Sequence, residues 1–178
     1  MSETSRKHKA EAPKTLSFAV ITVSSSRFKE QKSLGKIEDP SGDLTVQLVE
    51  KAGHKVVLRS LVPDDRVLIG KAVSEALGTD NVDVVITCGG TGVALSDVTI
   101  ETVRPLLVKT LPGFGEIFRR LSFDKIGSAA IMSRALAGVS DGGKAVFCLP
   151  GSPNAVSLCV ERLILPEAGH IVKHAREG

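Results

Sequence analysis

The chain has 178 residues, an apolar fraction of 42% and a formal net charge of +3 at pH 7. This length suits a single domain with one core. Trp and Tyr are absent, so the core has to be mainly aliphatic, which favours a parallel sheet rich in Val and Ile over an aromatic sandwich. No apolar run could span a bilayer, and the N-terminus lacks the apolar segment of a signal peptide. We therefore expect a globular protein with no membrane partner.

The positive charge is concentrated at the N-terminus. Residues 1–14 contribute +2 of the net charge, through Arg6, Lys7, Lys9 and Lys14 against Glu3 and Glu11. This segment has no apolar face to bury, so we predict a disordered basic tail over residues 1–14 and a single domain over residues 15–178. The domain has neither a basic stripe nor aromatic residues for stacking on bases, so we expect no nucleic-acid partner.

The thiols and imidazoles give no sign of a metal site. Cys88, Cys148 and Cys159 are odd in number and lack CxxC spacing, which is typical of reduced thiols in a cytoplasmic protein. His170 and His174 lie one helical turn apart, but the Glu of an HExxH motif is missing. A surface helix accounts for these two histidines better than a bound metal does.

Short apolar runs alternate along the chain with segments of helical periodicity. The runs predict buried strands at residues 16–23, 55–62, 82–88 and 144–150. The other segments predict helices at residues 44–52, 66–77, 99–107, 113–123, 153–165 and 166–175. Crossovers of this kind make neighbouring strands parallel and place helices on both faces of the sheet. The predicted fold is therefore a three-layer αβα domain with a mostly parallel, doubly wound sheet.

Local signals set several boundaries of these elements. Residues 24–42 are polar and are expected to form a long loop. We predict that Ser41 caps the helix that follows this loop, and that Pro166 occupies the first position of the last helix. Pro105 has to break or kink the helix that contains it.

Ligands of doubly wound sheets bind beyond the carboxyl ends of the strands. That rule selects Ser24–Arg27, Pro63–Asp65, Cys88–Asp97 and Leu149–Asn154. Two other glycine motifs do not qualify. Residues 138–145 precede a strand and lack the hydroxyl of a P-loop, and residues 113–118 lack the third glycine of a dinucleotide fingerprint. We predict a simple turn at Gly142-Gly143.

The loop Gly89-Gly90-Thr91-Gly92 follows a predicted strand and precedes a predicted helix. Glycines permit positive φ and close backbone approach, so several N–H groups can converge on a phosphate. Thr91 adds a hydroxyl, and the following helix N-terminus adds positive potential. The alternative is a plain tight turn followed by Asp97 as a helix cap.

Asp64 and Asp97 follow two different predicted strands, at the edge of one predicted crevice. Mg²⁺ is usually held by one or two carboxylates together with substrate phosphates. We therefore predict that these two acids hold Mg²⁺ while the glycine loop holds the phosphates. For Asp64 the alternative is structural, because acids are favoured in the first turn of any helix.

Two further patches fit phosphate chemistry. Ser133 and Arg134 place a hydroxyl beside a guanidinium, which is a natural phosphate pair, although a surface salt bridge would explain the Arg equally. Residues 149–154, LPGSPN, join a strand end to a helix N-terminus that would face the crevice, or they form an ordinary turn.

Taken together, these motifs resemble a known family. GGTG followed by DVT, then GFGEIFR, SRALAGV and LPGSPNAV, occur in that order within residues 16–175. The chain thereby resembles the molybdenum-cofactor biosynthesis proteins of the MoaB/Mog type and the homologous domains of plant and animal molybdopterin adenylyltransferases, including the gephyrin G domain. The resemblance implies a molybdopterin-binding α/β domain that assembles as a trimer or hexamer.

The activity implied by the resemblance is MgATP-dependent transfer of AMP to the terminal phosphate of molybdopterin, with release of pyrophosphate. Asp64 and Asp97 match the two important acids of the family and are our predicted catalytic and Mg²⁺-binding residues. The residues predicted to bind molybdopterin or its phosphate are Gly89, Gly90, Thr91, Gly92, Ser133, Arg134, Gly151 and Ser152. Those assigned to the nucleotide are Ser24, Ser25 and Pro150.

The chain departs from the family pattern at two places. Ser96 and Ile100 stand where the family often has the Arg and Pro of RDVTPE, and Ser24-Ser25-Ser26 stands where it often has SDS. The alternative function is a catalytically silent molybdopterin carrier, which would have no use for a metal-holding pair of acids. The expected partners are molybdopterin, ATP, other copies of the chain and a metal-insertion protein of the same pathway.

Overall fold

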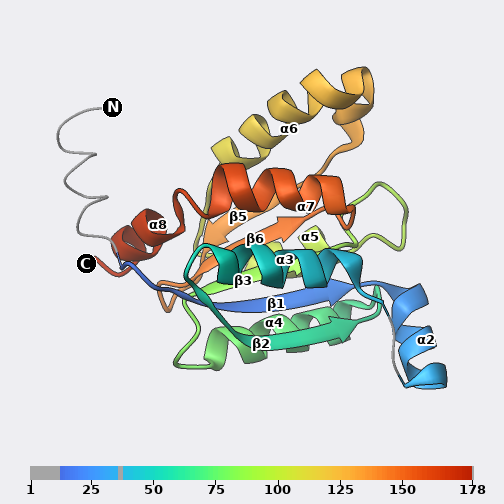
Figure 1. The fold of residues 1–178 in the computed structure, drawn as a ribbon, viewed down its shortest axis with the longest axis horizontal. Helices are drawn as coiled ribbons and strands as arrows, with labels where there is room; N and C mark the ends of the chain where they lie inside the picture. Colours follow the sequence, from blue (N-terminus) through green and yellow to red (C-terminus); the bar gives the residue numbers. More distant parts are fainter. Residues whose placement is uncertain (1–12, 36–37, 178) are drawn as a thin grey trace.

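The computed structural model describes residues 13–35 and 38–177, so the predicted basic tail lies outside the described residues except for Pro13 and Lys14. Six strands form one sheet in the order β2-β1-β3-β6-β5-β4 (Figure 1). The strands are β1 (Ser17–Val23), β2 (Lys55–Val62), β3 (Val84–Cys88), β4 (Lys109–Thr110), β5 (Leu136–Val139) and β6 (Ala145–Leu149).

Four of these strands, β2, β1, β3 and β6, are parallel and coincide with the four predicted strands. From β1 the chain moves outward to β2, then returns past β1 to form β3 and β6 on the other side. The direction of winding therefore reverses between β1 and β3. Such a reversal opens a crevice at the carboxyl ends of the two strands, as the predicted fold requires.

The remaining strands, β5 and β4, extend the sheet as antiparallel neighbours and were not predicted. β5 is the four-residue run Leu-Ala-Gly-Val, too short to be recognised by its periodicity. A side chain at Gly138 would place its Cβ 2.4 Å from the carbonyl oxygen of Lys109, so glycine permits the approach of β4. This edge of the sheet thus depends on a contact between segments distant in sequence.

Helices cover both faces and give the three predicted layers (Figure 1). One face carries α3 (Pro40–Lys51), α7 (Pro153–Cys159), α8 (Ala168–Ala175) and part of α6 (Pro112–Ile126). The other carries α4 (Arg66–Gly78) and α5 (Thr99–Val103). Alternate residues of each central strand enter the two cores, as Phe18 and Ala19 illustrate. No helix in the described ranges is both long and apolar enough to cross a membrane.

The largest departure from prediction is α2 (Ser25–Leu34), which occupies much of the expected loop. This helix buries none of its side chains, so it lacks the apolar periodicity by which a helix is recognised. The N-cap of α3 is Asp39 and not Ser41, because Pro40 fixes the first helical position and Asp39 accepts from the N–H of Gly42.

Near the C-terminus the predicted helix over residues 153–165 is α7 followed by a π-helical turn, η3 (Val160–Ile164). Pro166 lies in the turn before α8, which begins only at Ala168. Pro105 ends α5 as predicted, within the short 3₁₀ turn η1 (Arg104–Leu106). The predicted turn at Gly142-Gly143 is present, with Gly143 at φ 68°.

Candidate active site

A cavity of about 590 Å³ lies at the carboxyl ends of β1, β3 and β6. It brings together residues from five separate stretches of the chain, at the place selected by the reversal between β1 and β3. The predicted site residues that line it are Ser24, Ser25, Asp64, Gly89, Gly90, Thr91, Gly92, Asp97, Ser133, Arg134, Pro150 and Gly151.

Ser152 is the one predicted site residue outside this lining. Its side chain is the N-cap of α7 and accepts from the N–H of Ala155 at 3.3 Å. Of the residues predicted in segment 149–154, Ser152 therefore has the structural role of a helix cap. Pro150 and Gly151 line the cavity.

Two glycines allow three strand ends to meet below the cavity. A Cβ at Gly89 would lie 2.1 Å from the carbonyl oxygen of Val23 at the end of β1. Gly151, after β6, packs in turn against Gly89, and its Cβ would lie 3.2 Å from the Cα of Gly89. Gly89 also has φ 112°, a conformation that side chains rarely tolerate. These two glycines therefore shape the floor of the site.

The other two glycines of the loop lie against the two acids. A Cβ at Gly90 would come within 2.9 Å of Oδ1 of Asp64, and one at Gly92 within 2.6 Å of Oδ2 of Asp97. The loop thus passes beside both carboxylates and leaves them room that any side chain would fill. In the described part of the chain, the N–H groups of Gly90, Thr91 and Gly92 have no backbone acceptor. They are donors available to an anion.

Asp64 is held by the N-terminus of α2. Its Oδ2 accepts from the backbone N–H of Ser25 at 2.9 Å and from the Ser25 hydroxyl at 2.8 Å. The neighbouring Asp65, and not Asp64, caps α4 by accepting from the N–H of Leu68 at 2.9 Å. The structural alternative for Asp64, an acid of the first turn of α4, is therefore wrong. The carboxylate instead crosses to the segment after β1.

Asp97 closes the tip of the glycine loop. Its Oδ2 accepts from the N–H of Ala94 at 2.9 Å, and it does not cap α5, whose N-cap is Val98 with no side-chain bond. The alternative of Asp97 as a helix cap is wrong for that reason. Among the described residues, Oδ1 of Asp97 and Oδ1 of Asp64 have no hydrogen-bond partner. Each acid therefore keeps one oxygen for a ligand.

Arg134 supports the glycine loop Gly89–Gly92 through a side-chain hydrogen bond. Its Nε donates to the carbonyl oxygen of Thr91 at 2.9 Å, and its guanidinium pairs with Glu101 at 2.8 Å. Hydrogen bonding from Arg134 is the main cause that lowers the pKa of Glu101, against the opposing effect of burial. The surface salt bridge considered for Arg134 is thus present. Ser133 beside it lines the cavity with a half-buried side chain.

Several residues that line or support the site had no role assigned from the sequence, although Ser26 and Arg27 fall within the predicted segment Ser24–Arg27. Ser26 and Arg27 line the cavity from α2, and Ile126, Ala129 and Met132 form an apolar wall from the end of α6 and from η2 (Gly127–Met132). Thr99 holds the loop from behind, because its N–H donates to Gly90 and its hydroxyl to Gly89, both at 2.9 Å. The DVT motif was the available signal for Thr99. For Arg27 the only signal in the sequence was its position just after the first predicted strand, where ligands of such sheets bind.

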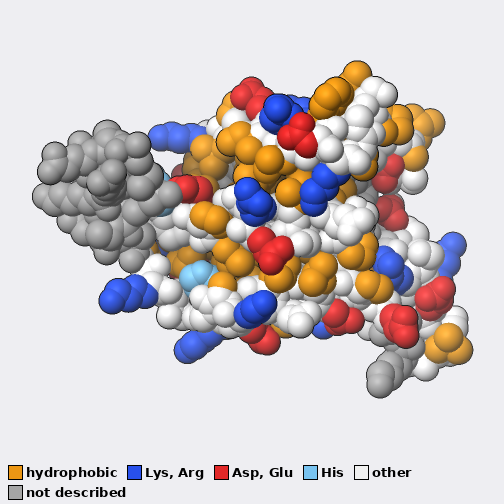
Figure 2. All heavy atoms as spheres, turned by 45° about the horizontal axis from the view of Figure 1, so that its top comes forward, with side chains coloured by type: hydrophobic (Ala, Val, Ile, Leu, Met, Phe, Trp, Pro, Cys, Tyr) orange, Lys and Arg blue, Asp and Glu red, His pale blue; other side chains and the backbone are white. Residues whose placement is uncertain are grey.

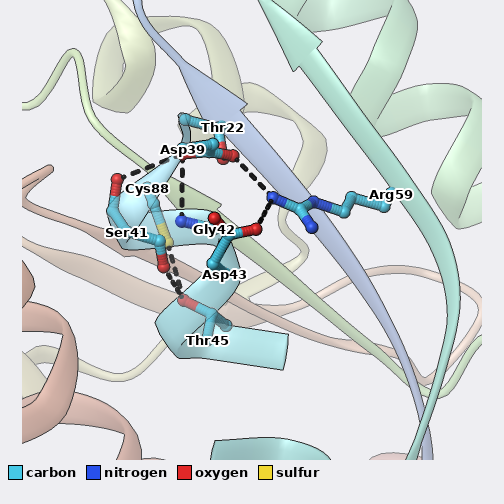
Figure 3. A network of polar contacts seen from close by, with 8 residues as sticks. All are labelled: Thr22, Asp39, Ser41, Gly42, Asp43, Thr45, Arg59 and Cys88. Atoms are coloured by element: carbon cyan, nitrogen blue, oxygen red, sulfur yellow. Dashed lines mark hydrogen bonds and ion pairs between the residues drawn. The ribbon is translucent and has the colours of Figure 1, made fainter. Parts of the chain in front are cut away.

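A buried polar network fixes the strand ends from below (Figure 3). Asp39 accepts from the Thr22 hydroxyl at 2.7 Å, from the N–H of Gly42 at 3.1 Å and from Arg59 at 3.1 Å. Thr45 lies in α3, the helix that Asp39 caps, and its hydroxyl contacts the sulfur of Cys88 at 3.4 Å. Thr22 and Cys88 are neighbours in the register of β1 and β3; Thr22 directly precedes the cavity-lining Val23, and Cys88 itself lines the cavity.

The cysteines are free and buried, as expected of reduced thiols. Burial raises the pKa of Cys88 to about 12, partly opposed by the hydrogen bond with Thr45. Burial likewise raises the pKa of Cys148 to about 12. Neither is a nucleophile near neutral pH, since the thiolate is the reactive form. Within residues 13–35 and 38–177 no group of three or more His, Cys, Asp or Glu side chains forms a metal site.

The arrangement of a glycine loop between two acids agrees with the resemblance drawn from the sequence. A family described as "Probable molybdopterin binding domain" matches residues 19–170. The chain belongs to this molybdopterin-binding family.

Relatives in the family match nearly the whole chain. It is 45% identical over 173 residues to molybdenum cofactor biosynthesis protein B of Bacillus subtilis, a match that covers 97% of each chain. It is 45% identical over 173 residues to the molybdopterin adenylyltransferase of Pyrococcus furiosus, covering 96% of this chain and 97% of that one.

A solved structure extends the likeness to the fold. The crystal structure of the tungsten cofactor synthesizing protein MoaB from Pyrococcus furiosus superposes with a TM-score of 0.82 at 43% identity. The match covers 93% of this chain and 100% of that one. The three-layer fold described above is therefore that of the molybdopterin-binding family.

Proposed function

We propose that the protein acts in molybdenum-cofactor biosynthesis as a molybdopterin adenylyltransferase. In this reaction AMP passes from ATP to the terminal phosphate of molybdopterin, and pyrophosphate is released. The observation that carries the proposal is the single cavity in which the glycine loop lies beside Asp64 and Asp97. A relative that is 45% identical over nearly its whole length bears the name of this activity.

The chemistry demands little of the protein beyond placement and charge. The terminal phosphate of molybdopterin is a monoester with a second pKa of about 6, so near neutral pH it is already a competent nucleophile. One of its oxygens forms a bond to the α-phosphorus of ATP while the bond from that phosphorus to the bridging oxygen breaks. No proton has to be removed, and no covalent intermediate with a side chain is needed. The buried cysteines are accordingly given no part.

We assign the placement of the two phosphates to the cavity walls. The free N–H groups of Gly90, Thr91 and Gly92 suit the phosphate of molybdopterin, together with the Ser133 hydroxyl. The segment Ser24–Arg27 and Pro150 on the opposite wall are left for the nucleotide. Holding two anions in line in this way supplies much of the rate enhancement in phosphoryl-type transfer.

Mg²⁺ is part of the proposal, with Asp64 and Asp97 as its protein ligands. The donor set fits, because Mg²⁺ is usually held by one or two carboxylates and completes its shell with phosphate and water oxygens. Each acid offers an Oδ1 that has no partner within residues 13–35 and 38–177, and the glycines beside the two acids leave the space open. When bound, the ion would neutralise charge on the phosphates.

The competing function is that of a silent molybdopterin carrier. The two acids argue against it, since two carboxylates beside a phosphate site repel the ligand of a pure carrier unless a cation lies between them. The experiment is to incubate the protein with molybdopterin and MgATP labelled at the α-phosphate. Labelled adenylylated pterin together with free pyrophosphate is expected. Binding of molybdopterin without any transfer would identify the carrier.

We also propose that the protein forms trimers or hexamers in the cytoplasm and passes its product to a metal-insertion protein. An apolar surface supports self-association. Figure 2 shows hydrophobic side chains gathered over the region of α6. The large exposed apolar side chains of α6 and η2 are Ile117, Phe123, Ile126, Ile131 and Met132. Closed cyclic assemblies are the usual outcome for soluble homo-oligomers. Sedimentation at micromolar concentration tests this, and a monomer alone would refute it.

A further inference from the structure

A second recess adjoins the active-site cavity on the far side of Arg134. It has a volume of about 560 Å³ and shares Ser133 and Arg134 with the first cavity. Beyond that shared wall it is lined by Arg104 of η1 and Arg119 of α6, together with Glu101. The function proposed above makes no use of Arg104 or Arg119.

Two of the three arginines of this recess, Arg104 and Arg119, have no ion-pair partner among the described residues. In the described ranges of the chain, no carboxylate forms an ion pair with Arg104 or Arg119, whereas Arg134 is paired with Glu101. Arg134 and Glu101 balance each other's charge, so the recess keeps about two positive charges from Arg104 and Arg119. Glu116 does not line this recess, but it shares a smaller adjoining recess with Arg104 and Arg119, where its negative charge offsets part of this excess.

Arg119 is positioned by the backbone and by the GFGEIFR motif. A Cβ at the buried Gly115, one turn earlier in α6, would lie 3.0 Å from Nη1 of Arg119 and 3.3 Å from the carbonyl oxygen of Ala135. The missing side chain therefore lets the guanidinium lie against the helix and lets α6 pack on the segment after Arg134. The half-buried Arg119 lines this recess and also the smaller adjoining recess that contains Gly115.

We propose that this recess binds pyrophosphate, with Arg104 and Arg119 as its ligands. Guanidinium groups form paired, charge-assisted hydrogen bonds with phosphate oxygens, and two of them suit an anion that carries charge at both ends. The recess adjoins the active-site cavity at Ser133 and Arg134, so pyrophosphate released in that cavity would have to move only into the neighbouring recess. The choice of pyrophosphate rests on the proposed adenylyl transfer, which releases it.

The test is a calorimetric titration of pyrophosphate into the full chain, in EDTA and without ATP or pterin. Arg119→Gln and Arg104→Gln are each expected to weaken binding by about 10- to 100-fold, the usual size of a charge-assisted bond. Arg120→Gln is the matched control, because Arg120 lies on the same helix and pairs with Asp124 outside the recess. Its affinity should equal that of the wild type.

Gly115→Ala separates geometry from charge. It removes no charge but displaces the Arg119 guanidinium, so we expect weaker pyrophosphate binding. Arg104→Gln should weaken binding by the same factor in the Gly115→Ala variant as in the wild type. Equal affinities for Arg119→Gln and Arg120→Gln would overturn the proposal, as would the absence of any wild-type binding in EDTA. Because the titration contains no ATP or pterin, it gives the same answer whether or not the protein transfers AMP. The outcome of the titration is therefore independent of the outcome of the labelled adenylyl-transfer assay proposed above.

Discussion

The acid in the buried network and the acids at the active site have opposite surroundings. Asp39 is 6% exposed, and both its oxygens accept hydrogen bonds, from Thr22, Gly42 and Arg59 among others. Asp64 and Asp97 are half-buried at the cavity wall, and among the described residues each accepts hydrogen bonds on one oxygen only. A carboxylate with all its hydrogen bonds made inside the protein stabilises the fold, whereas one with a free oxygen facing a cavity is available to a ligand.

The two kinds of acid are also linked. Asp39 holds Thr22 in place, and Thr45 of the same helix contacts Cys88, so the network fixes the residues just before Val23 and Gly89. Close approach of Gly89 to the carbonyl of Val23 then sets the floor of the cavity. We expect changes in the network to lower stability and changes at the cavity to lower rate. The following experiments test that separation.

Asp97→Asn should have the largest effect on chemistry. Asparagine keeps the size of the side chain and an oxygen that can accept from Ala94, but it removes the negative charge proposed to hold Mg²⁺. We expect a loss of about 100- to 1,000-fold in the rate of adenylyl transfer, with little change in melting temperature or pterin affinity. The measurement is labelled transfer across a Mg²⁺ titration.

Asp65→Asn is the control for that experiment. Asp65 is exposed, caps α4 and lies outside the cavity lining, and asparagine is an equally good cap. Its rate should equal that of the wild type. A wild-type rate for Asp97→Asn, with unchanged Mg²⁺ dependence, would show that Asp97 only shapes the loop.

Asp39→Ala should produce the largest loss of stability. It removes the cap of α3 and leaves the buried Thr22 hydroxyl without its acceptor, which together cost about 2–4 kcal/mol in the free energy of unfolding. Urea denaturation measures the change. Asp43→Ala is the matched control, since Asp43 is the exposed partner of Arg59 and such pairs contribute about 1 kcal/mol or less. Equal losses for both variants would contradict a special role for the buried acid.

Cys88→Ala tests the same network through pH. The raised pKa of Cys88 means that the folded protein keeps this thiol protonated up to about pH 12, whereas the unfolded thiol ionises near 9. The unfolded state therefore binds fewer protons between these values, and stability falls as pH rises through that window. From pH 9 to 11 the wild type should lose roughly 1 kcal/mol per pH unit more than Cys88→Ala. Parallel curves in urea denaturation would show that Cys88 does not contribute.

Ser133→Ala should have the smallest effect of the four. Loss of one hydrogen bond from the Ser133 hydroxyl to the charged pterin phosphate should weaken molybdopterin binding about tenfold, while ATP binding persists. Equilibrium titrations with each ligand separate the two. An equal loss of affinity for both ligands would assign Ser133 to the structure of the cavity and not to the pterin phosphate.

Much of the fold and the composition of the site could be predicted from the sequence. The four parallel strands are recognisable because each is a short apolar run followed by a helical period, and that alternation permits few topologies. Asp64, Asp97 and the glycine loop could be selected because strand ends are where such sheets bind ligands. The motifs GGTG, DVT and SRALAGV indicate the family without any knowledge of the fold.

Only the tertiary structure determined which atoms each of these residues contacts. The sequence places Asp64 and Asp65 side by side, and only the packing of α2 shows that Asp64 binds Ser25 while Asp65 caps α4. Likewise α2 has no apolar periodicity, and β5 is recognisable only through its pairing with β6. The physical reason is that local patterns record which side chains need burial, whereas hydrogen bonds between distant segments depend on how the whole sheet is assembled.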